Sequence, residues 1–148
     1  MDAERLGTYY DAFNSLLTGG WLGAGIHRTV YTCPLRDDLV IKVETVNDGA
    51  QRNFANVREW EFWNEHQDCE KIARWLAPCI MISYDGRLLA QKRVAPLAYD
   101  EKMPDKLPAF LTDLKRSNFG KLNGKLVCTD YGFTIPSPSV RLKKAHWG

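Results

Sequence analysis

One amphipathic segment, NFANVREWEFWNEH at residues 53–66, lies between two pairs of strand-like runs, and this order constrains the fold more than any other feature. Its apolar residues form a broad stripe at helical spacing, as in a helix packed on a sheet. Turn-forming residues at 34–37 separate the first pair of runs, and Asp85-Gly86, a strong hairpin signal, separates the second. The runs are residues 21–33, 38–46, 79–84 and 87–92. This pattern predicts an α+β fold in which one helix packs on an antiparallel sheet.

Composition narrows the class of protein. With 148 residues, 45% of them apolar, the chain can bury the core of one domain. Twenty Lys and Arg against 18 Asp and Glu give a net charge of +2, which by itself favours neither a nucleic-acid nor a membrane surface. The four cysteines lack the spacing of a zinc site or a disulfide framework, and no apolar run is long enough to span a membrane. We expect a cytoplasmic protein with reduced thiols.

The chain divides into four segments at its glycines and prolines. Apolar residues at helical spacing predict an amphipathic helix within residues 1–20. Residues 21–95 hold the strand and helix pattern, residues 96–135 form a smaller second part, and residues 136–148 are predicted to be a flexible basic tail, RLKKAHWG at its end.

Within the second part, residues 106–114 are predicted to form a short helix and residues 126–129 a strand after a turn at Asn123-Gly124. Prolines after Phe133 disfavour regular structure there.

A glycine-containing stretch and a strand lysine come first among the candidate site residues. In LGAGIHRTVY, Gly23 and Gly25 allow the backbone to approach phosphate oxygens because no Cβ intervenes. The alternative is an ordinary glycine-containing hairpin. Nineteen residues after Gly23, Lys42 interrupts the apolar strand LVIKVE. The alternative for Lys42 is a side chain in solvent.

A lysine used for phosphate binding needs a carboxylate to hold it, and the packed helix offers two. Glu59 has Phe62 and Trp63 at i+3 and i+4, so it lies beside the face that turns toward the sheet. Glu61 faces away from that pair. We therefore select Glu59, with a solvated helix glutamate as the alternative.

Two short stretches near the end of the chain combine carboxylate, amide and ammonium groups. In TDLKRSNFG, Asp113 precedes Asn118 by five residues, and Lys115 lies between them. Seventeen residues after Asp113, Asp130 opens DYG behind a short predicted strand. Carboxylate and amide oxygens are suitable ligands for Mg²⁺, and a lysine can neutralise a transferring phosphoryl group.

The ordered set LGAGIHRTVY, VIKV, NVREWEFW, DLKRSN and DYG resembles the protein kinase superfamily, especially the short serine/threonine kinase-like proteins encoded by bacteriophages. The resemblance covers residues 22–133. It implies an N-lobe at 21–95 with an antiparallel sheet and one helix, a hinge near 91–96, and a severely reduced C-lobe at 96–135. It also implies ATP between the lobes and, for a phage protein, the host cytoplasm as location.

The same resemblance implies a role for each candidate residue. Arg28 stands where the family has a third glycine, which adds a cation near the expected phosphates. The residues implied in nucleotide binding are Gly23, Gly25, Arg28, Lys42 and Glu59. The catalytic residues implied are Asp113, Lys115 and Lys42, and the Mg²⁺ ligands are Asn118 and Asp130.

Two departures from the family pattern leave two functions open. Leu111 and Thr112 stand where the family has His and Arg, and no APE motif or helical run follows DYG. The first hypothesis is a minimal ATP- and Mg²⁺-dependent phosphotransferase acting on a host protein or on itself. The second is a weak or inactive kinase-like binding module that docks on a host protein and modulates it. Neither hypothesis calls for a membrane or a nucleic acid.

Overall fold

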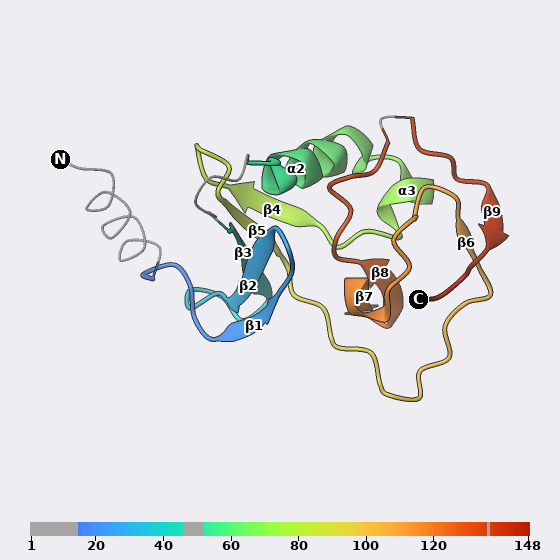
Figure 1. The fold of residues 1–148 in the computed structure, drawn as a ribbon, viewed down its shortest axis with the longest axis horizontal. Helices are drawn as coiled ribbons and strands as arrows, with labels where there is room; N and C mark the ends of the chain where they lie inside the picture. The colour runs from blue at the N-terminus through green and yellow to red at the C-terminus, as the bar shows by residue number, and fades with distance from the viewer. Residues whose placement is uncertain (1–14, 46–51, 136) are drawn as a thin grey trace.

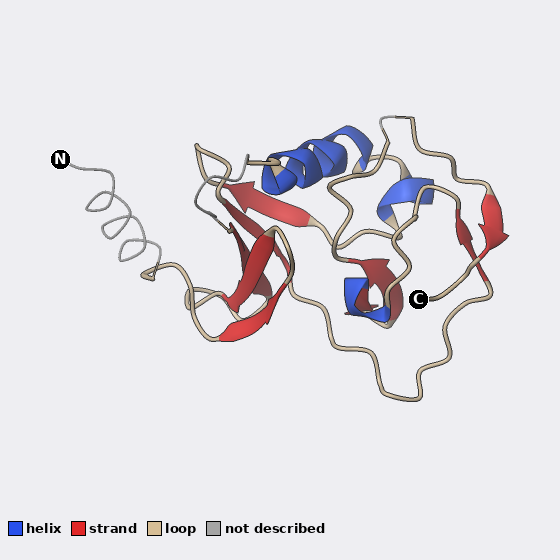
Figure 2. Cartoon of the chain, viewed as in Figure 1, coloured by secondary structure: helices blue, strands red, loops and turns tan. Residues whose placement is uncertain are grey.

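The computed structural model describes residues 15–45, 52–135 and 137–148. It is an α+β fold in which a sheet with its helix forms one part and short paired strands form the other (Figures 1 and 2). Most of the helix predicted within residues 1–20, and Val46 at the end of a predicted strand, lie outside the described residues.

The first part is built on a five-stranded sheet whose order is β1-β2-β3-β5-β4 and whose neighbours all pair antiparallel. The predicted antiparallel sheet is confirmed. The hairpin at Asp85-Gly86 is confirmed as well, with Gly86 at φ 75°, a conformation that suits glycine. The strands are β1 (Trp21–Ala24), β2 (Arg28–Thr32), β3 (Leu39–Glu44), β4 (Cys79–Ile82) and β5 (Leu88–Lys92).

The predicted strand at residues 21–33 is in fact a hairpin of β1 and β2. The chain reverses after Ala24, and the Gly25 amide donates a hydrogen bond of 2.8 Å to the carbonyl of Arg28. Residue type alone suggested one continuous run because the reversal needs only three residues. As a result, Arg28 becomes the first residue of β2 and pairs with Glu44 of β3.

Helix α2 (Ala55–His66) confirms the helix predicted at residues 53–66, starting two residues later. Its most buried side chains are Ala55, Asn56, Glu59 and Phe62. Of the predicted apolar stripe, Phe62 is buried, whereas Val57, Trp60 and Trp63 are only partly buried. The helix therefore turns two polar side chains toward the sheet, and Asn56 donates hydrogen bonds to the carbonyls of Lys42 and Arg87.

The second part consists of short elements joined by long loops. The predicted turn at Asn123-Gly124 and the strand after it are confirmed, and the turn closes a hairpin with strand β7, which was not predicted; both turn residues have positive φ. No helix in the described part of the chain is long and apolar enough to cross a membrane. Helix α3 (Glu70–Ala73) lies between α2 and β4 in the chain. The elements after the sheet are β6 (Lys106–Pro108), the 3-10 turn η1 (Arg116–Asn118), β7 (Phe119–Leu122), β8 (Lys125–Cys128) and β9 (Leu142–Lys144).

Two predictions for the chain after residue 105 are wrong. Residues 106–108 form strand β6 instead of a helix, since Pro108 disfavours a helical Leu107 and removes a backbone donor. Residues 142–144 form strand β9 although the sequence after Phe133 indicated no regular structure. The two strands pair antiparallel, with Leu107 opposite Lys143. Each strand thus finds its backbone hydrogen-bond partner in a segment far away in sequence.

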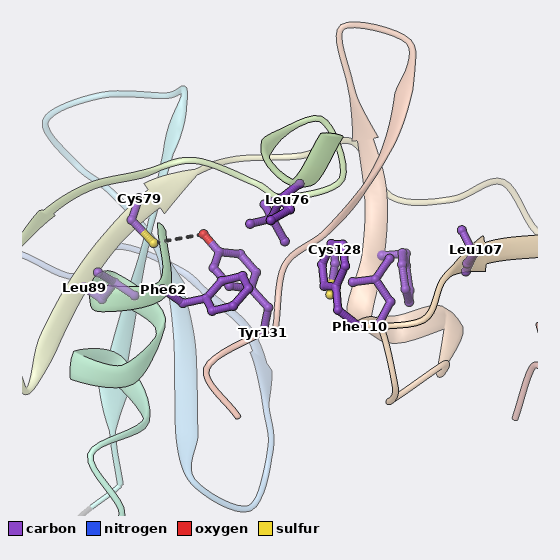
Figure 3. Close-up of a cluster of buried hydrophobic side chains, with 11 residues drawn as sticks. Phe62, Leu76, Cys79, Leu89, Leu107, Phe110, Cys128 and Tyr131 are labelled. Carbon is purple, nitrogen blue, oxygen red and sulfur yellow. Dashed lines mark hydrogen bonds between the residues drawn. The ribbon is translucent and has the colours of Figure 1, made fainter. Parts of the chain in front are cut away.

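One apolar core joins the two parts. It includes Phe62, Cys79 and Leu89 from the helix and sheet, and Leu107, Phe110 and Cys128 from the second part. Figure 3 shows Tyr131 lying between these groups, with its hydroxyl 3.2 Å from the sulfur of Cys79. The Tyr131 hydroxyl also donates to the carbonyl of Ala77 at 2.6 Å. The turn that carries Asp130 is thereby anchored in the core by the next residue.

Candidate active site

A cleft of about 700 Å³ lies between the β1–β2 hairpin and two segments of the second part, residues 110–119 and 128–134. Eight of the nine predicted site residues line it, and Glu59 lies buried behind Lys42. The eight residues are Gly23, Gly25, Arg28, Lys42, Asp113, Lys115, Asn118 and Asp130. Sequence positions more than 100 residues apart are thus brought to one cavity.

The two hairpin glycines leave room for a ligand. A Cβ added at Gly23 would meet no described atom within 4 Å, and one added at Gly25 would meet only the carbonyl of Arg28, at 4.0 Å. Neither glycine has a positive φ. These glycines therefore allow a ligand to approach the backbone closely, and no unusual backbone conformation requires them.

Lys42 of β3 and Glu59 of α2 form a buried ion pair, with 2.7 Å from Nζ to Oε2. The pairing that sequence reasoning selected over Glu61 is present, and Glu61 is exposed. Lys42 also donates to the carbonyl of Thr129, at the end of β8. Burial lowers the pKa of Lys42, and the nearby Arg28 charge lowers it further. The ammonium therefore lies at the cleft wall, next to the turn that carries Asp130.

Arg28 does not extend into the cleft as a free phosphate-binding cation. Its guanidinium is buried and donates to both Glu59 oxygens, at 2.7 and 3.2 Å, and to Asp130 Oδ1 at 2.8 Å. A fourth bond of 3.2 Å reaches Asn56 Oδ1. Burial opposes the charge, but Glu59 and Asp130 outweigh it and raise the pKa of Arg28. Arg28 therefore links β2, α2 and the DYG turn, and its expected place near the phosphates stays a prediction.

Glu59 is the anion around which this cluster is organised. Its side chain is 0% exposed and accepts bonds from Arg28, Lys42 and the Tyr131 amide, the last at 2.8 Å. Burial alone would raise the pKa of Glu59, but the Arg28 and Lys42 charges overcome it and lower that pKa to about 2. Glu59 is therefore a carboxylate throughout the physiological range, and it fixes two cations and the DYG backbone.

The loop with Asp113 offers polar groups to the opposite wall of the cleft. Asp113 and Lys115 are both largely exposed, with 4.0 Å between Lys115 Nζ and Asp113 Oδ1. The Asn118 side-chain amide donates to the Asp113 carbonyl at 3.2 Å, and the Asn118 carbonyl accepts from the Thr129 amide at 2.8 Å. Asn118 thus holds the loop through one bond to Asp113 and one bond to Thr129, which directly follows β8.

The DYG turn packs tightly against the start of α2. A Cβ on Gly132 would lie 2.8 Å from the carbonyl of Ala55, so only glycine fits there without a shift. Gly132 has no positive φ, so close packing and not turn geometry requires the glycine. This contact sets how far Asp130 stands from the helix that carries Glu59.

Asp130 and Asn118 fit a magnesium ion shared with a ligand, but not an all-protein metal cage. The Asp130 side chain is 47% exposed and both residues line the cleft, while only one carboxylate oxygen of Asp130 is bonded to Arg28. No cluster of three or more His, Cys, Asp or Glu ligands occurs among the residues that the structure describes. Magnesium commonly takes one or two protein oxygens and completes its shell with phosphate and water.

The expected hinge at residues 91–96 is engaged in protein contacts instead of lining the cleft. Ala95 exchanges two backbone hydrogen bonds with Lys121 of β7, at 2.8 and 2.9 Å. Gly120 permits this approach, since a Cβ there would lie 2.3 Å from Val94 Cγ2. Gly120 is visible in the sequence, directly after Phe119, as a site where another backbone could approach. The sequence did not show that the approaching segment is Ala95, 25 residues earlier.

Several residues that shape the site were not singled out from the sequence. Asn56 orients Arg28, Tyr131 anchors the DYG turn, and Phe119 lines the cleft directly after Asn118. Asn56 in particular was hidden, because a polar residue on a helix is most often solvated. Its complete burial is the only sign of its role, and burial is visible only in the fold.

Comparison with protein-family models finds no family that matches the chain, and comparison with curated proteins finds no significant match. The evidence for function therefore lies in the site itself, where charged side chains and an open glycine backbone line one cleft.

Proposed function

We propose that the protein is a minimal phosphotransferase of the protein-kinase type, which uses ATP and Mg²⁺ and transfers a phosphoryl group to a hydroxyl on a host protein or on its own chain. The observation that carries the proposal is the convergence of eight predicted site residues on one cleft. The Lys42–Glu59 ion pair at the rear of that cleft supports it further, because a phosphate-binding lysine needs such an anchor.

The proposed reaction depends on positioning and on charge. Lys42, held by Glu59, attracts phosphate oxygens, while the open backbone at Gly23 and Gly25 lets them approach. Asp113 orients the acceptor hydroxyl and accepts its proton as the hydroxyl oxygen bonds to the γ-phosphorus of ATP and the bond from that phosphorus to the leaving ADP breaks. Lys115, 4.0 Å from Asp113, is close enough to neutralise charge on the group in transfer.

Asn118 and Asp130 would hold the metal. When bound, Mg²⁺ would supply positive charge that offsets the negative charge of the phosphate group. The contribution of the chain is to keep these two ligands on rigid supports: Asn118 through its bond to the Asp113 carbonyl, and Asp130 through Arg28 and the anchored Tyr131.

A second candidate function is a kinase-like binding module that modulates a host protein. The Arg28–Asp130 ion pair favours it, because one oxygen of the expected metal ligand is already engaged by a protein cation. The described residues after DYG, 133–135 and 137–148, also contain no helix, whereas the family has the helices of its substrate-binding lobe there. Both observations would suit a site that binds nucleotide without transferring phosphate.

Nucleotide binding and transfer are measured separately to distinguish the two functions. Thermal unfolding with ATP, with and without Mg²⁺, reports binding, because a ligand that binds only the folded state raises its stability. Incubation with γ-labelled ATP, alone and with host lysate, reports transfer. We expect stabilisation by Mg²⁺-ATP in the wild type, reduced by Lys42→Met, and label transfer abolished by Asp113→Asn without loss of stabilisation.

Matched controls are the exposed residues Lys125 and Asp100, changed to Met and Asn. If Mg²⁺-ATP stabilises the wild type but no label is transferred under any condition, the binding module is the correct function. If Lys42→Met and Lys125→Met respond identically to nucleotide, the cleft is not the nucleotide site and the proposal fails.

A further inference from the structure

We infer that the C-terminal segment, residues 139–148, is a built-in support of the Asp113 loop and that Trp147 is a positioning residue for Asp113. This inference rests on the proposed role of Asp113 in phosphoryl transfer. The segment was expected to be a flexible basic tail. Instead, it contacts the residues that precede the Asp113 loop and also the residues that follow Asp113.

Before the loop, the segment forms a continuous set of backbone hydrogen bonds. Strand β9 pairs with β6, and flanking bonds extend the pairing in both directions. The Ala145 amide donates to the Asp105 carbonyl at 2.8 Å, and the Phe110 amide donates to the Ser139 carbonyl at 3.1 Å. The chain therefore reaches Leu111, two residues before Asp113, already held by the segment.

After Asp113, the segment contacts the loop again. The Gly148 amide donates to the Leu114 carbonyl at 2.9 Å. The Trp147 ring meets Phe119 edge to face, with 5.0 Å between ring centroids, and its indole N–H donates to the Pro104 carbonyl at 3.0 Å. Figure 1 shows the C-terminal end beside the β7–β8 hairpin, in agreement with the ring contact. Asp113 is thus bracketed by hydrogen bonds at Phe110 and Leu114.

The loop that carries Asp113 lacks regular structure, although Phe110 and Leu111 at its start are buried in the core. Between Phe110 and η1 it has no helix or strand, and the side chains of Asp113 and Lys115 are more than half exposed. Leu111 and Thr112 are apolar or small, so neither brings the charged anchor that His and Arg would bring. A misplacement of about 1 Å in a catalytic group can cost about 100-fold in rate. Apart from the segment, the loop is held by the buried side chains of Phe110 and Leu111 and by the hydrogen bonds of Arg116 and Asn118.

The contacts of the C-terminal segment are confined to one region, which distinguishes a role in positioning the Asp113 loop from stabilisation of the whole fold. The bonds from residues 139–148 described above reach residues 104–119, whereas Lys42, Glu59 and Arg28 are held by one another and by the DYG turn. Loss of the Trp147 contacts should therefore alter the Asp113 loop and leave nucleotide binding at Lys42 in place.

The test compares Trp147→Ala and Trp147→Phe in the full chain, with Trp60→Ala as the matched control. Trp60 is another partly buried tryptophan against the same core, located on α2. Hydrogen exchange is measured on peptides covering residues 110–118 and 39–44, because local opening is reported segment by segment. With γ-labelled ATP, kcat and the KM for ATP are measured on the same variants.

For Trp147→Ala we expect exchange at residues 110–118 to rise about tenfold and exchange at 39–44 to stay unchanged. We expect kcat to fall about 100-fold while the KM for ATP changes less than about twofold. Trp147→Phe keeps the ring against Phe119 and should recover most of the loss. Should Trp147→Ala not fold, Gly148→Pro removes the amide that bonds to Leu114 while it keeps the Trp147 side chain, and the same exchange pattern is expected.

Unchanged exchange at residues 110–118 in both Trp147→Ala and Gly148→Pro would overturn the inference. An equal effect of Trp60→Ala on that peptide would do the same, since it would show general loosening of the core. The exchange measurement needs no catalytic activity. If the wild type transfers no label, the proposed function fails while the exchange data still decide whether the segment holds the loop.

Discussion

Arg28 and Asp130, 102 residues apart in sequence, form an ion pair of 2.8 Å between the first residue of β2 and the DYG turn. The same guanidinium holds Glu59, so one buried cation connects the glycine hairpin, helix α2 and the turn that carries the expected metal ligand. Asp130 therefore serves two partners in the proposed function, because a bound Mg²⁺ must share or replace Arg28 at this carboxylate.

Replacement of Arg28 should destabilise the fold strongly. Arg28→Gln leaves the buried Glu59 with Lys42 as its remaining cation, and loss of one partner from a buried ionic cluster costs about 3 kcal/mol. Urea unfolding measures the change. Arg36→Gln, which removes an exposed pair with Asp38, is the control and should have little effect. Equal changes in the two variants would show that the Arg28 cluster contributes no more than a surface pair.

Glu59 should make stability depend on pH in the acid range. Its pKa is lowered to about 2 in the folded protein, so its contribution is complete above its ordinary pKa of 4.5 and is lost as pH falls toward about 2. One pKa unit corresponds to about 1.4 kcal/mol, which predicts a loss of about 3 kcal/mol. Urea unfolding between pH 6 and 2 should show this slope, reduced in Glu59→Gln. Parallel curves for the two proteins would refute the assignment.

Gly120 should tolerate no side chain, because its α-carbon faces the 94–95 backbone. In Gly120→Ala the new methyl would lie 2.3 Å from Val94 Cγ2 and 2.8 Å from the Ala95 carbonyl. We expect a destabilisation of about 2 kcal/mol, typical of overpacking. Gly20→Ala is the matched control, since a methyl there comes no closer than 3.8 Å to Thr32 Oγ1. A stable Gly120→Ala protein would mean that β7 and the 94–95 segment separate readily.

The four thiols should differ sharply in reactivity. Cys69 is exposed, whereas Cys33, Cys79 and Cys128 are buried. Burial raises the pKa values of Cys79 and Cys128 to about 12, so at pH 8 only about one in 10,000 of these thiols is ionised. Titration with a disulfide reagent should give one fast thiol in native protein and four in denaturant. Two or more fast native thiols would indicate opening of the core around Tyr131.

Local patterns predicted most of the sheet and its helix. The Asp85-Gly86 turn, the Asn123-Gly124 turn and helix α2 all depend on residues within one turn or a few helical steps of each other. Such signals act through backbone conformation and side-chain spacing, which the sequence displays directly. The choice of Glu59 over Glu61 followed from the same spacing, and the ion pair with Lys42 agrees with it.

The errors arose where the partner of a residue lies far away in sequence. Residues 106–108 became a strand because residues 142–144 pair with them, and neither segment shows the pairing by itself. For Arg28, which was expected to add a cation near the phosphates, the sequence did not show the buried partners. Arg28 turns inward because Glu59 and Asp130, supplied by two other elements, compensate the cost of burying its charge.

The sequence by itself determined which residue types are present and much of their local setting: a glycine-containing stretch, a strand lysine, a helix glutamate, and the Asp113 and Asp130 stretches. Only the tertiary structure decided that these residues meet at one cleft, that Arg28 ties Asp130 to Glu59, and that the C-terminal segment brackets Asp113. The physical reason is that buried charges and unpaired backbone groups must find partners, and the fold, not sequence proximity, supplies those partners.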